Sequence, residues 1–342
     1  MADAASAAPQ GGPAAEAAPR PSAARPAGGA GRRARAWLAP VLLFAALALV
    51  PFLAKLGPES FVLSLMTRVV ILALAALSLD LLIGVGGMIS FGHAAYLGIG
   101  AYAVGILSSH GIEEAGVQLA AAIGGSALFA LVTGAIALRT QGVYFIMSTL
   151  AFGQMLFFLA TALAPYGGDD GMTLSGRSLV GGASLLKSDA ALYGVALASL
   201  AAAYLFGRAL VASRFGRVLR GARENATRME AIGFAPYPYR LVTYVIAGAL
   251  AGVAGFLSAQ QAEFVSPAVM SWQRSGDLIF MVVLGGLGTL HGAVAGAAAF
   301  LLIEEALSHY TTHWRIIFGP LLIGAVLFFR GGLLGPATRR PG

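Results

Sequence analysis

Apolar runs long enough to cross a bilayer recur along this chain, from residue 37 to residue 329. About 20 consecutive apolar residues, each rising about 1.5 Å along a helix, cover the hydrocarbon core of a membrane. Backbone amides find no water in that core, so each spanning helix must satisfy its own hydrogen bonds. The strands of a membrane barrel alternate apolar and polar residues, and the runs lack that pattern. The sequence therefore predicts an all-α, polytopic bundle of transmembrane helices.

The composition supports a membrane bundle, because 58% of the residues are hydrophobic, 11% are charged and the mean hydropathy is +0.80. The net charge of +7 would suggest a nucleic-acid partner in a soluble chain. In a membrane protein the positive-inside rule explains it, so we expect no nucleic-acid partner. Cysteine is absent, which excludes a disulfide framework, a thiol nucleophile and a thiolate metal site.

The chain divides into a tail and a transmembrane domain. Residues 1–35 are rich in Ala, Pro and Gly, so we predict a disordered cytoplasmic tail. Residues 36–335 form the predicted transmembrane domain, with about eight to ten spans, some of them short or broken. The predicted spans lie at residues 37–56, 69–84, 91–109, 117–138, 143–163, 191–212, 241–258, 277–290, 292–307 and 316–329.

The basic residues give the predicted orientation. With the amino terminus inside, most of the 22 Lys and Arg residues fall on the cytoplasmic side. The opposite side holds only Lys55, Arg68, Arg177, Lys187, Arg274 and Arg315. We therefore expect both termini in the cytoplasm, the stretch 164–190 outside, and the stretch 213–240 in the cytoplasm.

The cytoplasmic stretch has the pattern of one short amphipathic helix between Ser213 and Gly233. Gly233 stands where a helix C-cap is expected, and Pro236 and Pro238 prevent the helix from continuing. At 100° per residue the apolar side collects five residues. They are Val218, Leu219, Ala222, Ala226 and Met229.

Two interpretations of this stretch are open. A basic loop on anionic headgroups accounts for the arginines, each of which contributes about 1 kcal/mol near the surface. It does not account for Glu224 and Glu230, which weaken lipid attraction. A docking surface for a cytoplasmic protein accounts for both signs of charge.

The segment "RENATRMEAIGF" resembles the cytoplasmic coupling segment of ABC-importer permeases, which carries a Glu-Ala-x-x-x-Gly type signature. In those permeases this loop inserts into a cleft on the ATPase subunit. It is most similar to the LivM-type permeases of branched-chain amino-acid importers. The resemblance implies a coupling role for the residues that match, which are Arg223, Glu224, Asn225, Glu230, Ala231 and Gly233.

A second block, "LSLDLLIGVGGMISFGHAAYLGIGAYAVGIL", is rich in small residues that allow helices to approach closely. Asp80 stands out, because a carboxylate in a span is costly unless it is paired or wet. A structural hydrogen bond and a place in the translocation pathway both remain open for it. His93 fits an interhelical hydrogen bond better than a proton relay. The candidate pathway residues are Asp80, Ser90, His93 and Tyr102.

This block also resembles the LivM-type family, as do "GVYFIMSTLAFGQM" and the segment from Ser266. Together the matching blocks extend over residues 60–330. Two positions depart from the family's pattern, with Asp80 where asparagine is usual and Met88 where glutamine is usual. These departures put the substrate in doubt, not the fold.

The resemblance implies the permease subunit of an ATP-driven ABC importer for branched-chain or related amino acids. Its implied partners are a second homologous permease, two ATPase subunits and an extracytoplasmic substrate-binding protein in the bacterial inner membrane. We expect no enzyme activity, since the sequence has no Gly-x-x-x-x-Gly-Lys-Ser/Thr loop and no nucleophile motif. No His, Asp and Glu cluster has metal-ligand spacing, so we expect neither a cofactor nor a metal.

Alternative functions stay open at this point. A urea or short-chain amide importer permease belongs to the same superfamily and would accommodate the changes at Asp80 and Met88. An ion-coupled secondary transporter would use Asp80 and His93 for coupling. A membrane-embedded enzyme has almost no support in the sequence.

Overall fold

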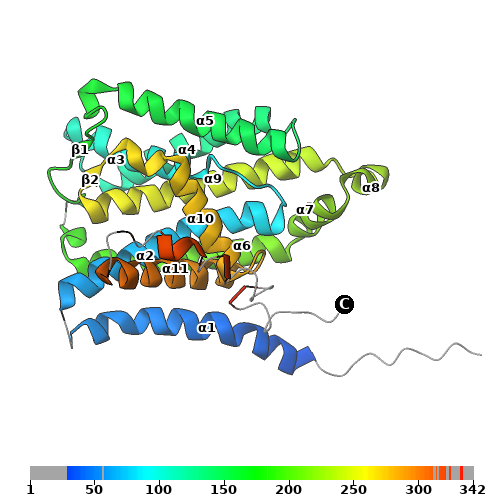
Figure 1. The fold of residues 1–342 in the computed structure, drawn as a ribbon, viewed down its shortest axis with the longest axis horizontal. Coiled ribbons are helices and arrows are strands. Elements are labelled where there is room, and N and C mark those ends of the chain that lie inside the picture. The colour runs from blue at the N-terminus through cyan, green and yellow to red at the C-terminus, as the bar shows by residue number, and fades with distance from the viewer. Residues whose placement is uncertain are drawn as a thin grey trace, which may run out of the picture.

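The computed structural model describes residues 29–55, 58–182 and 184–310, together with residues 313, 316–320, 323, 324, 332 and 333. The described part of the chain is a bundle of long helices (Figure 1). The first helices are α1 (Gly29–Ala54), α2 (Glu59–Asp80), α3 (His93–Ser109), α4 (Ala115–Ala137), α5 (Val143–Ala162) and α6 (Asp189–Ala212). The others are α7 (Arg214–Glu224), α8 (Ala226–Ala231), α9 (Pro236–Ala262), α10 (Trp272–Gly285) and α11 (Leu290–Tyr310).

Six helices among the described residues are long and apolar enough to cross a membrane. They are α2 with its π-helical extension to Val85, α4, α5, α6, α9 and α11. The apolar part of α1 (Leu38–Ala54), α3 with 17 residues and α10 with 14 residues are shorter. Each of these helices lies on a predicted span, which confirms the polytopic helical fold.

At each end of the chain, part of the predicted segment lies outside the residues that the structure describes. Residues 1–28 of the predicted tail lie outside the described residues, and α1 begins at Gly29. Half of the predicted span at 316–329 also lies outside them.

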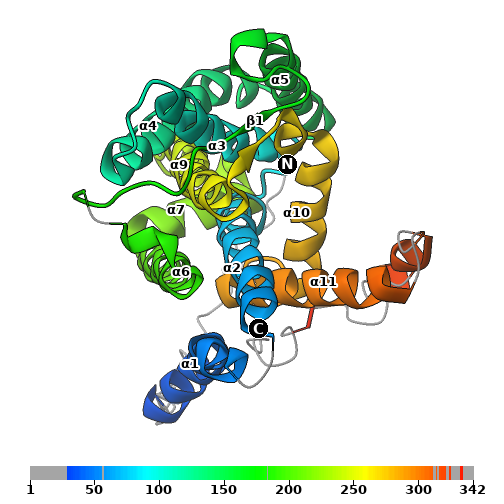
Figure 2. The same ribbon diagram turned by 90° about the vertical axis from the view of Figure 1, so that its left-hand side faces the viewer.

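Helix α2 is the central element of the bundle (Figure 2). It packs against α6, α9, α10 and α11, and 89% of its most apolar window is buried. Only 22% of the corresponding window in α5 is buried, so α5 presents apolar side chains outward. A helix buried on all sides organises the core of such a bundle, whereas an outer helix faces lipid.

Small residues bring α3 and α9 into close contact, as the sequence predicts. A Cβ atom at Gly100 would meet the backbone of Gly252, and one at Gly255 would meet the backbone of Leu97. In the membrane such backbone approach allows the packing that holds helices together. Substitution of either glycine would therefore force the two helices apart.

The bundle has two distinct ends (Figure 1). At one end α7 and α8 project beyond the other helices. At the opposite end the strands β1 (Met172–Thr173) and β2 (Phe264–Val265) pair antiparallel, with Met172 opposite Val265. Three short helical turns complete the connections, η2 (Ala164–Tyr166), η3 (Leu185–Lys187) and η4 (Pro267–Met270). In the predicted orientation, α7 and α8 mark the cytoplasmic end and the strands mark the outer end.

Candidate functional site

The stretch 213–240, which is predicted to be cytoplasmic, forms two helices, so the expectation of one helix between Ser213 and Gly233 is wrong. Asn225 interrupts it with an extended backbone at φ −158° and ψ 101°. Its side-chain oxygen accepts a 2.9 Å hydrogen bond from the backbone N–H of Arg228 and so caps α8. Asparagine is among the residues most favoured at this position, because its side chain satisfies an amide at the start of a helix.

The predicted end of this stretch is confirmed. Gly233 has a φ of +90°, a left-handed conformation that glycine adopts at little cost. The N–H of Phe234 donates to the carbonyl of Met229 at 3.0 Å, and the N–H of Gly233 donates to that of Glu230 at 2.9 Å. These two bonds close α8 as a Schellman motif, and α9 begins three residues later with Pro236 at its first position.

The six residues that match the coupling motif gather at the tip formed by α7 and α8. Glu224, Asn225, Glu230, Ala231 and Gly233 are exposed there. Sequence reasoning missed the apolar side chains beside them. Ile232 is 62% exposed and Phe234 is 39% exposed. Exposed apolar groups surrounded by charges are typical of a protein interaction surface. The signal for them was present in "EAIGF", where the large apolar residues Ile232 and Phe234 follow the charged Glu230.

A cavity of about 650 Å³ opens on the same end, between α7, α8 and the start of α9. Phe215, Met229 and Phe234 supply its apolar and aromatic lining. Arg214 and Arg217 supply positive charge. The tip therefore combines acidic residues, a basic groove and exposed apolar side chains.

Arg223 differs from the other motif residues, because its side chain turns back toward the bundle. Its Nη1 atom donates a hydrogen bond to the carbonyl oxygen of Gly84, in the π-helical segment η1 (Leu81–Val85) that ends α2. Its aliphatic part lies over Gly87, where a Cβ atom would be 2.7 Å from Cγ of Arg223. Between α2 and α3 the chain passes through η1 and then the non-helical residues 86–92, and we call this segment the break after α2. Arg223 thus links the end of α7 to the break after α2.

The same break is held from the other side by Asp80, which is fully buried. Its Oδ1 atom accepts a 2.8 Å hydrogen bond from the backbone N–H of Gly288, in the turn between α10 and α11. The guanidinium of Arg223 also attracts this carboxylate electrostatically. A buried carboxylate requires such partners, and Gly288 provides one for Oδ1, whereas Oδ2 has no hydrogen-bond partner among the described residues. Three segments far apart in the sequence therefore meet at the inner end of α2.

The other candidate pathway residues lie between packed helices. The Nε2 atom of His93 forms a 2.8 Å hydrogen bond with the hydroxyl of Ser78 on α2, and both side chains are fully buried. This contact agrees with the interhelical role expected for His93. Ser90 and Tyr102 are also buried. A role in the translocation pathway stays a prediction for the four candidate residues, Asp80, Ser90, His93 and Tyr102.

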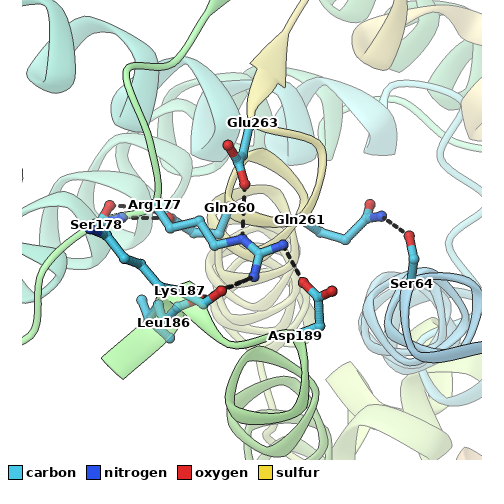
Figure 3. A network of polar contacts seen from close by, with 9 residues as sticks. All are labelled: Ser64, Arg177, Ser178, Leu186, Lys187, Asp189, Gln260, Gln261 and Glu263. Atoms are coloured by element: carbon cyan, nitrogen blue, oxygen red, sulfur yellow. Dashed lines mark hydrogen bonds and ion pairs between the residues drawn. The ribbon is translucent and has the colours of Figure 1, made fainter. Parts of the chain in front are cut away.

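At the outer end, a polar network that the sequence analysis did not predict joins the loop after α5 to two helices. Figure 3 shows the guanidinium of Arg177 between the carboxylates of Asp189, at 2.6 Å, and Glu263, at 3.1 Å. Arg177 also donates to the carbonyls of Leu186 and Lys187, at 3.2 and 3.1 Å. The network therefore connects this loop to the start of α6 and the end of α9.

Beside it, three buried side chains bond with one another. Ser178 bonds to Gln118 on α4 and to Gln260 on α9, and its backbone N–H donates to Oε1 of Gln260 at 2.8 Å. Each glutamine is at most 1% exposed. A polar side chain in an apolar span finds a partner across helices, and the isolated glutamines were the only sequence signal for this cluster.

The comparisons with known proteins agree with this architecture. The family described as "Branched-chain amino acid transport system / permease component" matches residues 61–329. The permease protein LivM of the high-affinity branched-chain amino acid transport system of Escherichia coli (strain K12) is 25% identical over 303 residues, covering 80% of this chain and 69% of LivM. LivH of the same organism is 28% identical over 284 residues, covering 77% of this chain and 91% of LivH. No solved structure matches.

Proposed function

Because the chain belongs to the family of branched-chain amino acid transport permease components, we propose that it is the membrane subunit of an ATP-driven ABC importer. The chain is a multi-pass membrane protein, and its relatives are transport permeases rather than enzymes. Its cargo in this proposal is a branched-chain or related amino acid. Its location is the bacterial inner membrane, with both termini in the cytoplasm.

The tip formed by α7 and α8 carries this proposal. Glu224 ends α7, Glu230 lies in α8, and the exposed Ile232 and Phe234 follow directly after α8. Both helices project at one end of the bundle (Figure 1). A lipid surface would favour the basic residues there but oppose the acidic ones. A protein partner with a complementary cleft accommodates apolar, acidic and basic groups together. We assign that cleft to an ATPase subunit, and each of the two permeases of the importer would engage one.

Arg223 suggests how movement of the tip reaches the membrane. When the ATPase subunits close on ATP, they push α7 and α8. Arg223 passes this displacement to the carbonyl of Gly84 and so to the break after α2. The adjoining turn at Gly288 moves with it, because Asp80 bonds the two segments together. Rigid helices joined at a break can switch between two arrangements, which is what alternating access requires.

The alternative of an ion-coupled secondary transporter would use Asp80 and His93 to carry the coupling ion. Both side chains are fully buried and bonded to neighbouring segments, Asp80 to Gly288 and His93 to Ser78. The family match and the charged tip favour the ATP-driven importer over this alternative. A urea or short-chain amide importer permease is the second alternative, and the ligand that the outer cavity of the bundle can bind distinguishes it from an amino-acid importer.

Charge reversal at the tip tests the proposal. We expect Glu230→Arg to abolish co-purification with the ATPase subunits and uptake, while the chain still inserts into the membrane. Glu113→Arg is a matched control, because Glu113 is an exposed acid whose carbonyl accepts a 2.8 Å hydrogen bond from the N–H of Leu179, in the stretch 164–190 that is predicted to lie outside. Full ATPase association and uptake in Glu230→Arg would refute the coupling assignment.

A further inference from the structure

A second cavity, of about 220 Å³, opens in the outer half of the bundle between α2, α3, α9 and α10. Its outer wall is the connection that contains β2 and η4. Clefts that hold drug-sized ligands measure roughly 300–1,000 Å³, so this cavity suits a smaller molecule. It lies at the end of the bundle at which an extracytoplasmic binding protein would release its cargo.

The floor of this cavity is aliphatic. Ile71 on α2, Leu97 on α3, and Leu278 and Met281 on α10 line it. Each of these side chains is at most 5% exposed. A branched hydrocarbon group would find apolar contacts there and leave no polar atom unsatisfied.

The rim of the cavity carries both signs of charge. Arg68 lies 3.5 Å from Glu304, and Arg274 lies 3.8 Å from Asp277. The two arginine side chains are 36% and 43% exposed, and that of Asp277 is 38% exposed. Exposed pairs at such distances contribute little by themselves. Each guanidinium has five N–H donors, so it can bind a further carboxylate without losing its present partner.

We propose that this outer cavity binds a zwitterionic amino acid with a branched aliphatic side chain. The α-carboxylate lies against Arg68 and Arg274, the α-ammonium lies against Asp277, and the side chain enters the aliphatic floor. The inference rests on the proposed importer function and names the ligand class of its outer site. Charge-assisted hydrogen bonds to the carboxylate and the ammonium orient the ligand in the cavity. The aliphatic floor favours ligands whose side chain is a hydrocarbon.

The same chemistry disfavours urea as the ligand. Urea is neutral, so it can form hydrogen bonds but no ion pair with the arginines or Asp277, and it has no hydrocarbon group to fill the floor at Leu278 and Met281. A third cavity, of about 230 Å³, lies toward the cytoplasmic end, between the segment that follows α2 and the start of α5. Its lining includes Arg223 and Arg240 but no acidic residue, so it lacks the partner that an ammonium group needs.

Ligand competition on the unmodified protein tests the zwitterion assignment. The complete transporter, with both permeases and the ATPases but without the binding protein, is placed in lipid nanodiscs, and binding of radiolabelled leucine is measured. Unlabelled leucine should displace half of the bound label at a concentration at least tenfold lower than two analogues require. These are isovalerate, which lacks the ammonium, and 3-methylbutylamine, which lacks the carboxylate. Urea should not compete. Equal competition by either singly charged analogue, or by urea, would overturn the proposal.

Two variants locate the site. Asp277→Asn should weaken leucine binding at least tenfold and leave isovalerate binding unchanged, because only the ammonium contact is lost. Leu278→Phe should weaken both ligands, because the ring fills the floor. Asp170→Asn is the matched control, an exposed acid in the outer loop that should change neither. Unchanged leucine binding in both cavity variants would overturn the assignment.

ATP-driven leucine uptake by the same complex, measured with the binding protein present, separates this inference from the proposed function. Uptake without saturable leucine binding to the nanodisc complex would overturn the outer site and leave the importer proposal standing. Absence of ATP-driven leucine uptake would overturn the importer proposal itself.

Discussion

The carboxylate of Asp80 accepts a 2.8 Å hydrogen bond from the backbone N–H of Gly288, a residue 208 positions away in the chain. This bond ties the break after α2 to the turn between α10 and α11. The hydrogen bond needs an acceptor at position 80 but not a negative charge. That distinction separates a structural role in an importer from ion coupling in a secondary transporter.

We predict that Asp80→Asn retains most of the uptake, because its amide oxygen can still accept from Gly288. Asp80→Ala should lose it, because the buried N–H of Gly288 would be unpaired at a cost of about 1–3 kcal/mol. Uptake assays on both variants, normalised to the amount of protein in the membrane, check this. An ion-coupled mechanism predicts the opposite for Asp80→Asn, namely loss of uptake with the charge.

Gly84 permits the close approach of these segments. A Cβ atom at this position would overlap Oδ1 of Asp80 and the backbone of Gly288. We predict that Gly84→Ala destabilises the protein by about 1–3 kcal/mol, as overpacking of a filled core does. Thermal unfolding in detergent measures the change. Gly194→Ala on α6 is the control, because nothing lies within 4 Å of its added methyl group. It should be neutral or stabilising by up to about 1 kcal/mol. Equal stability of the two variants would contradict the packing described at Gly84.

Arg223 should contribute to the movement that follows ATPase binding, and it should not contribute to ATPase binding itself. We predict that Arg223→Ala keeps the ATPase subunits bound but lowers uptake at least tenfold, because the contact with Gly84 is lost. Arg223→Lys should recover only part of the uptake, since an ammonium lacks the planar fork of guanidinium. Co-purification and uptake measured on the same preparations distinguish the two steps.

Arg139→Ala provides the control for Arg223, because it removes an exposed arginine from the connection between α4 and α5, which is predicted to lie in the cytoplasm. It should leave uptake unchanged. Loss of ATPase association in Arg223→Ala would instead place this residue in the docking surface with Glu230.

The network around Arg177 should stabilise the outer end. Arg177→Ala removes the partner of both Asp189 and Glu263, and we predict a loss of about 2 kcal/mol in unfolding free energy. Lys187→Ala, in the same loop, removes the same charge from an exposed side chain but keeps the carbonyl that Arg177 contacts. It should change stability little. Similar unfolding temperatures for the two variants would show that the network contributes nothing measurable.

Hydropathy was sufficient to predict the helices, because the length of a span is set by the thickness of the bilayer. The predicted span at 117–138 and helix α4 (Ala115–Ala137), for example, agree within two residues. Local cap signals also predicted the turn at Gly233. The break at Asn225 was missed, because the apolar pattern continues through it and only the preference of asparagine for helix starts opposed it.

Contacts between distant segments could not be predicted from one sequence. The motif assigned Arg223 to the ATPase, yet its guanidinium bonds to Gly84 across 139 positions. The cluster of Gln118, Ser178 and Gln260 likewise joins residues up to 142 positions apart. Such pairs are fixed by the packing of whole helices, which neither periodicity nor spacing along the chain specifies.

Leucine uptake into proteoliposomes that contain the complete transporter tests the central claim most directly. With ATP available to the ATPase subunits, the binding protein on the opposite side and no ion gradient, we predict leucine accumulation that requires ATP. A protonophore should leave it unchanged. Accumulation that needs no ATP and collapses when an imposed ion gradient is dissipated would contradict the account.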